Sequence, residues 1–123
     1  MTQLSKNYDL EERTAKFGEE VIKFCRSMNQ DVISKPIISQ LVRSATSVGA
    51  NYMEANTASS RKDFRNKISI CKKEAQETRH WLRMIAEAAS NCKEEARKLW
   101  KECQELVLIF QKIISSTDKK SKV

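Results

Sequence analysis

A single histidine limits the metal chemistry that this 123-residue chain can support. Glu77 and His80 are three residues apart, a spacing that di-iron four-helix bundles use to place two ligands on one helix face. Those bundles need a second Glu-x-x-His pair, which one histidine cannot supply. A site for one metal ion, built from Glu54, Glu77 and His80, is the remaining metal alternative. We predict that the protein holds no metal and no other cofactor.

The serines and cysteines also lack the spacing of catalytic nucleophiles. No serine has a suitably placed histidine partner, and the four cysteines form no CxxC pair. Cys25, Cys71 and Cys103 fall on apolar helix faces, where a free thiol packs as a small hydrophobic group. We therefore expect a protein that is not an enzyme. Without a signal-peptide pattern or a run of 18 apolar residues, we also expect it to be cytoplasmic, with reduced thiols and no membrane partner.

Residues 40–54 carry a stripe of small and polar side chains on one side of the predicted helix, next to an apolar stripe with the same spacing. Its members recur at spacings of three and four: Gln40, Ser44, Ser47, Asn51 and Glu54. Residues 36–58 carry only two charges, Arg43 and Glu54. Such a surface suits close packing on more than one side. We expect this helix to pack within its own bundle and also against another copy of the chain.

The following helix carries charges inside its wide apolar arc, with Lys67 and Glu74 in the middle and Glu77 at the margin. Charges among core positions are costly unless they are paired. We predict a buried polar network that fixes helix register or a subunit contact rather than a catalytic site. Its expected members are Gln40, Ser44, Asn51, Glu54, Lys67, Glu74 and Glu77.

Five cations on the outer face of the same helix recur at spacings of 4, 7, 7 and 4 residues. This basic ridge consists of Arg61, Arg65, Lys72, Arg79 and Arg83. It is about 33 Å long at 1.5 Å per residue. The formal net charge of +7 and the pI of about 9.4 favour polyanionic partners. The ridge offers cations to phosphates and no aromatic side chain for bases; its alternative interpretation is an ordinary solvated face.

Periodicity and capping signals predict an all-α, antiparallel up-down-up-down four-helix bundle. The expected helices span about 9–29, 34–57, 60–89 and 91–115, with capping signatures at Asp9, Ser60 and Asn91. With only two glycines and one proline, the chain has few of the residues that form tight turns and hairpins. We expect one bundle domain at 9–115, an N-terminal tail at 1–8 and a disordered basic tail at 116–123.

Two segments carry a family resemblance, QLVRSATSVGANYMEA at 40–55 and SSRKDFRNKISICKKEAQETRHWL at 59–82. They resemble the bacterial four-helix bundle proteins encoded in intervening sequences of 23S ribosomal RNA genes. The accessory variability determinant proteins of diversity-generating retroelements are more distantly similar. The resemblance covers roughly residues 8–115. It implies a homopentamer with a central channel, no established enzymatic activity, and a suggested role with nucleic acid.

Two hypotheses about function follow. The first is a non-enzymatic oligomeric module that binds the backbone of RNA or DNA through its basic face, and that could serve a nucleic-acid-processing protein. The alternative is a structural or protein-interaction homo-oligomer whose basic charge is incidental. Copurified nucleic acid would separate them.

Overall fold

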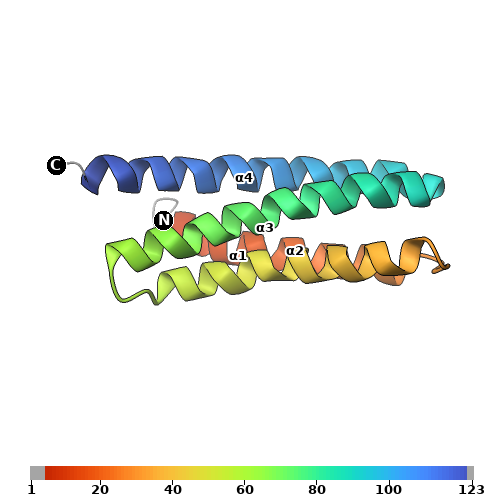
Figure 1. The fold of residues 1–123 in the computed structure, drawn as a ribbon, viewed down its shortest axis with the longest axis horizontal. Helices are drawn as coiled ribbons and strands as arrows, with labels where there is room; N and C mark the ends of the chain where they lie inside the picture. The colour runs from red at the N-terminus through yellow and green to blue at the C-terminus, as the bar shows by residue number, and fades with distance from the viewer. Residues whose placement is uncertain (1–4, 122–123) are drawn as a thin grey trace.

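The computed structural model describes the backbone of residues 5–121 and the side chains of residues 10–119. The backbone forms four long helices and one short turn of 3₁₀ helix: α1 Ser5–Arg26, α2 Ser34–Asn56, α3 Arg61–Ala88, η1 Ser90–Cys92 and α4 Lys93–Ser121. Within this described part there is no β-strand. The helices run antiparallel, one beside the next (Figure 1), so the predicted all-α four-helix bundle is confirmed.

The helices pack in a closed ring around one apolar core. α2 lies between α1 and α3, and α3 between α2 and α4, while α1 approaches α4 less closely. Arg13 of α1 spans this looser edge, with its guanidinium 2.7 Å from a Glu102 oxygen and 2.6 Å from a Glu105 oxygen. The edge between the first and last helices is therefore joined by charge as well as by apolar packing.

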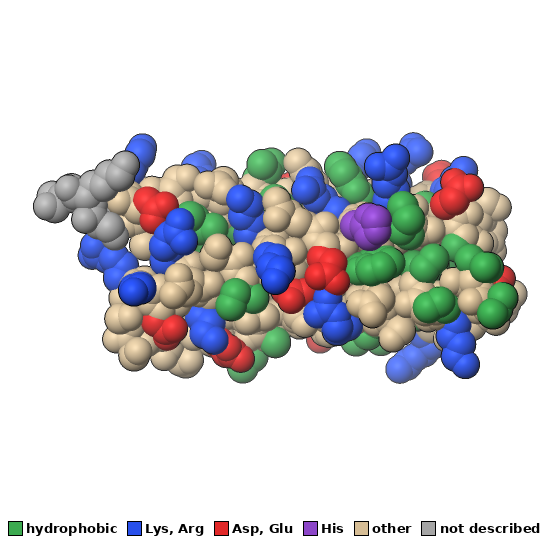
Figure 2. Space-filling view, viewed as in Figure 1, with side chains coloured by type: hydrophobic (Ala, Val, Ile, Leu, Met, Phe, Trp, Pro, Cys, Tyr) green, Lys and Arg blue, Asp and Glu red, His purple; other side chains and the backbone are tan. Residues whose placement is uncertain are grey.

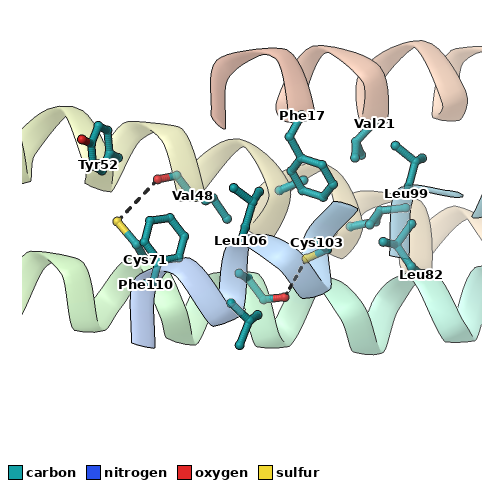
Figure 3. Packing of buried hydrophobic residues seen from close by; sticks show 14 of the residues in the cluster. Phe17, Val21, Val48, Tyr52, Cys71, Leu82, Leu99, Cys103, Leu106 and Phe110 are labelled. Carbon is teal, nitrogen blue, oxygen red and sulfur yellow. Dashed lines mark hydrogen bonds between the residues drawn. The ribbon is translucent and has the colours of Figure 1, made fainter. Parts of the chain in front are cut away.

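All four helices contribute large side chains to the core (Figure 3). Phe110, Leu41 and Ile68 are fully buried. The predicted burial of Cys25, Cys71 and Cys103 is confirmed. Burial raises the pKa of the Cys25 thiol to about 11 and the pKa values of Cys71 and Cys103 to about 12. The Cys71 thiol donates to the Val48 carbonyl oxygen at 3.6 Å, so it acts as a small packing group.

The two ends of the bundle differ from the sequence prediction. α1 begins at Ser5, not at Asp9, because no glycine or proline interrupts these residues and an acidic residue is tolerated early in a helix. α4 continues to Ser121, so the prediction of a disordered tail from residue 116 is wrong as far as Ser121. Burial of Ile114 and Thr117 and an ion pair of Asp118 hold this extension. The rest of both predicted tails, residues 1–4 and 122–123, lies outside the described residues.

Local capping accounts for the sharp starts of α2 and α3. Ser60 accepts a hydrogen bond from the Asp63 backbone N–H at 3.0 Å, so the capping prediction for α3 is confirmed. The start of α2 uses a reciprocal pair that the sequence analysis missed. Asp31 accepts from the backbone N–H of Ser34 at 2.8 Å, and the Ser34 hydroxyl accepts from the Asp31 N–H at 3.0 Å. These bonds lower the pKa of Asp31.

Candidate nucleic-acid interface

The basic ridge lies along the seam between α3 and α4. Three of its members bond to α4, and these pairs form what we call the α3–α4 ladder: Arg65 with Asp118, Lys72 with Gln111, and Arg79 with Gln104. Each step moves seven residues forward on α3 and seven residues back on α4. This is the spacing at which facing side chains of antiparallel helices meet repeatedly. The heptad spacing of the ridge therefore serves packing as well as charge.

The ladder leaves most of the ridge's positive charge in place. Arg65 is neutralised by Asp118, since their atoms lie 2.6 and 3.1 Å apart, and this contact raises the pKa of Arg65. Lys72 and Arg79 bond to uncharged amides. Among the described residues, no acidic group lies within ion-pair distance of Lys72, Arg79, Arg61 or Arg83. Four positive charges thus remain available to an anionic partner.

The excess positive charge of the chain is concentrated in α3 and α4. The α3 sequence has eight Lys and Arg residues against four Asp and Glu, and the α4 sequence has seven against five. The α1 sequence is balanced at five and five. Figure 2 shows many Lys and Arg side chains along one face of the molecule, with fewer Asp and Glu side chains among them. A polyanion would therefore be attracted to the α3–α4 side of the bundle.

The polar network expected from the sequence is divided into separate groups. In the first, Arg43 of α2 reaches two carboxylates of α3: its Nη1 lies 3.3 Å from Glu74 Oε1, and its Nη2 bonds to Glu77. The Trp81 indole N–H also donates to Glu77 at 3.2 Å. The bond from Arg43, followed by that from Trp81, lowers the pKa of Glu77. Arg43 was missing from the predicted network, although it is one of few charges on α2.

The other predicted members lie apart from this group. Lys67 pairs with Glu54 at 2.7 Å, and the Glu54 side chain is 58% exposed. Ser44 is buried and accepts a bond from the Thr78 hydroxyl at 2.9 Å. Two members bond within α2: Gln40 accepts from Arg43 at 3.4 Å, and Asn51 donates to the Ser47 carbonyl at 2.8 Å. In the single chain these contacts link α2 to α3 at two heights, one at Arg43 and Ser44 and the other at Glu54, without one continuous buried network.

The alternative metal site is not assembled in this arrangement. Glu54 and Glu77 each face a cation, and His80 is exposed with its ring edge on Trp81, the ring centroids being 4.9 Å apart. Where side chains are described, no three His, Cys, Asp or Glu residues come together to hold a metal ion. None of the described helices is both long enough and apolar enough to cross a membrane.

The outward surface of α2 carries little net charge. Its exposed residues include Ala50 and Met53, whose side chains line a groove of about 380 Å³ against Gly18 and Ile22 of α1. Arg43 and Glu54 are both neutralised by α3. Covering such a surface with another chain would strip water from few unpaired charges. Three glutamates of α1 also line the groove, so the outward face of α2, rather than the groove as a whole, is the surface that suits a subunit contact.

Comparisons with known proteins give a consistent family. A family model described as 23S rRNA-intervening sequence protein matches residues 6–112. A crystal structure of a protein of unknown function from the S23 ribosomal protein family of Bacteroides thetaiotaomicron VPI-5482 is 28% identical. The match covers 85% of this chain and 97% of that one, with a TM-score of 0.76. Among curated proteins, none matches.

Proposed function

Because the chain belongs to the family of 23S rRNA-intervening sequence proteins, we propose that it is a non-enzymatic, homo-oligomeric module that binds RNA or DNA in the cytoplasm. The contact would be to the phosphate backbone, through the α3–α4 side of the bundle. One observation carries the proposal: the surplus of positive charge lies in α3 and α4, and four cations of the basic ridge have no acidic partner among the described residues.

A surface that binds the phosphate backbone of a nucleic acid needs cations and no catalytic groups. Lys and Arg side chains attract any nucleic-acid backbone, and these contacts supply most of the affinity for non-specific sequences. One chain would bind weakly with four free cations. Several copies held in one oligomer would act together on one long strand and gain affinity without any new contact. Oligomerisation through α2, pentameric as the family resemblance implies, is thus part of the same proposal.

The alternative is a homo-oligomer that binds only protein. One observation favours it: the two charged residues near the middle and end of α2, Arg43 and Glu54, are paired with α3, which leaves the outward face of α2 with little unpaired charge beside the groove against α1. The two functions make different demands on the basic ridge. A protein-interaction module would keep all its activity when the ridge is reversed in charge.

Charge reversal at two ridge residues outside the α3–α4 ladder tests the proposal. Arg61→Glu with Arg83→Glu changes the net charge by four units without removing any ladder bond. Lys16→Glu with Arg26→Glu changes the charge equally at exposed positions of α1. Fluorescence anisotropy of a labelled RNA strand and a labelled DNA duplex should show a much larger loss of affinity for the α3 variant. Equal losses would mean that only net charge matters and would remove the α3–α4 side from the account.

A further inference from the structure

A hollow lies beyond the last rung of the α3–α4 ladder, next to the connection between the two helices. It has a volume of about 470 Å³, within the range of roughly 300–1,000 Å³ that is usual for small-molecule sites. The side chains of Leu82, Ala86 and Ala96 form its apolar lining, and Leu82 and Ala96 are buried. This lining is therefore part of the bundle itself and does not depend on a flexible loop.

The ladder explains why the space is open there. The next step of seven residues after Arg79 and Gln104 brings Ala86 opposite Arg97, and both line the hollow. Ala86 is too short to bond to a guanidinium. Among the described side chains, none hydrogen-bonds to Arg97 or forms an ion pair with it. Arg97 thus occupies the next position of the α3–α4 ladder, but no described side chain pairs with it.

The remaining lining combines further cations with one aromatic ring. Arg83, Lys93 and Lys101 surround the hollow, and among the described residues Glu87 is the only acidic one that lines it. Trp100 is 36% exposed and also lines the hollow. The Arg79 guanidinium carbon lies 5.8 Å from the centre of the Trp100 ring, close enough to hold the indole in place by a cation–π contact.

From this arrangement we infer that the hollow binds one unpaired nucleotide of a single-stranded nucleic acid. The base stacks on Trp100, and its flanking phosphates contact Arg97, Arg83 and Lys101. Aromatic side chains beside a cationic track are the usual means of holding single strands, because every base offers a flat face. A paired base is unavailable for such stacking. The inference rests on the proposed function and adds to it a preference for single strands over duplex.

The test compares three probes on the full chain in its native oligomeric state. They are an oligothymidylate of about ten nucleotides, an abasic strand of the same length, and a duplex. The oligothymidylate should bind about tenfold more tightly than the abasic strand, since stacking one base on an aromatic ring has that order of effect. Trp100→Ala should remove this difference, and Trp100→Phe should keep most of it. Equal affinity for the first two probes, or a difference that persists in Trp100→Ala, would overturn the inference.

Fluorescence gives a second readout that does not depend on the stability of a Trp100 variant. Trp81→Phe leaves Trp100 as the only tryptophan, and Trp81 lies away from the hollow, bonded to Glu77. The oligothymidylate should then quench the fluorescence of Trp100, and the abasic strand should not. No quenching at saturating oligothymidylate would also overturn the inference.

The phosphate contacts have a matched control on the same helix turn. Arg97→Gln should weaken binding of the oligothymidylate and of the abasic strand alike, whereas Lys98→Gln, at an exposed position outside the hollow, should change it little. Equal effects of the two variants would contradict the role of Arg97. If none of the three probes binds to the native protein at low salt, the proposed function itself fails. If all three bind equally, backbone binding stands and only the nucleotide site is lost.

Discussion

Arg43 illustrates how single charged residues hold this bundle together. Its guanidinium contacts both Glu74 and Glu77, and the Glu74 side chain is only 15% exposed. The sequence showed that Lys67, Glu74 and Glu77 sit among apolar positions and must be paired. It could not show which cation would meet which carboxylate, because that depends on the relative height of α2 and α3. The partners lie 31 and 34 residues apart in the chain.

Replacing Arg43 should lower the free energy of unfolding more than replacing Glu54, the other charged residue in 36–58. Arg43→Ala leaves the mostly buried Glu74 without its cation, which should lower the free energy of unfolding by about 1–3 kcal/mol. Glu54→Ala breaks an exposed ion pair and should cost less than about 1 kcal/mol. Urea denaturation of both variants measures the difference. An equally large loss for Glu54→Ala would mean that another subunit buries this carboxylate.

Thiol reactivity tests the burial of individual core residues. Cys92 is only half-buried, while the thiols of Cys25, Cys71 and Cys103 are buried and burial raises their pKa values. At pH 8 the folded protein should therefore react with an aromatic disulfide reagent at Cys92 first, and the other three should react only on unfolding. Rapid reaction of three or four thiols in the folded protein would contradict the packing described here.

At the scale of the helices, sequence patterns predicted the interior better than the ends. Leu41, Val48 and Leu106 follow the apolar periodicity and are fully buried. The start of α3 at Ser60 was readable because its cap is local in sequence. The extension of α4 to Ser121 was not, because its ion pair joins Asp118 to Arg65, 53 residues earlier. The exposure of Trp100 was not readable for a similar reason: periodicity gives a helix face, and only the neighbouring helix shows whether that face is covered.

The cap of α3 gives a prediction at this scale. Ser60→Ala removes the acceptor for the Asp63 N–H and should lower the free energy of unfolding by about 1 kcal/mol. Ser59→Ala is the matched control, because only the backbone N–H of Ser59 contacts Asp63, at 3.4 Å. Thermal melts followed by circular dichroism compare the two. Equal melting temperatures for both variants would show that the Ser60 hydroxyl does not stabilise the helix start.

For the whole molecule, the separation of surfaces is the main structural result. The neutral outward side of α2 lies on one part of the bundle, and the cationic α3–α4 seam on another. A protein with this arrangement can assemble and still present its cations to a partner. The sequence indicated both surfaces, as a helix poor in charge and a ridge rich in it. The hollow beside Trp100 needed the structure, because its lining comes from two helices.

The assembly should depend on the outward side of α2. The native protein should have the mass of several chains by light scattering at micromolar concentration. Ala50→Arg places a long charged side chain in the groove between α1 and α2, where it would obstruct close packing of another chain, and should lower the mass without loss of helicity. Ser116→Arg, which adds the same charge at an exposed position of α4, should leave the mass unchanged. A native mass of one chain would remove the oligomer from the proposal.

The salt dependence of nucleic-acid binding tests the central claim most directly. Each phosphate that the protein neutralises releases counterions, so affinity falls as salt rises. If the four free ridge cations each contact a phosphate of a duplex, the affinity should drop about a hundredfold between about 50 and 200 mM salt. Fluorescence anisotropy of a labelled duplex with the native oligomer measures this slope. Binding at low salt with a slope of this size is the predicted result; no binding at 50 mM salt, or an affinity that does not change with salt, would contradict the account.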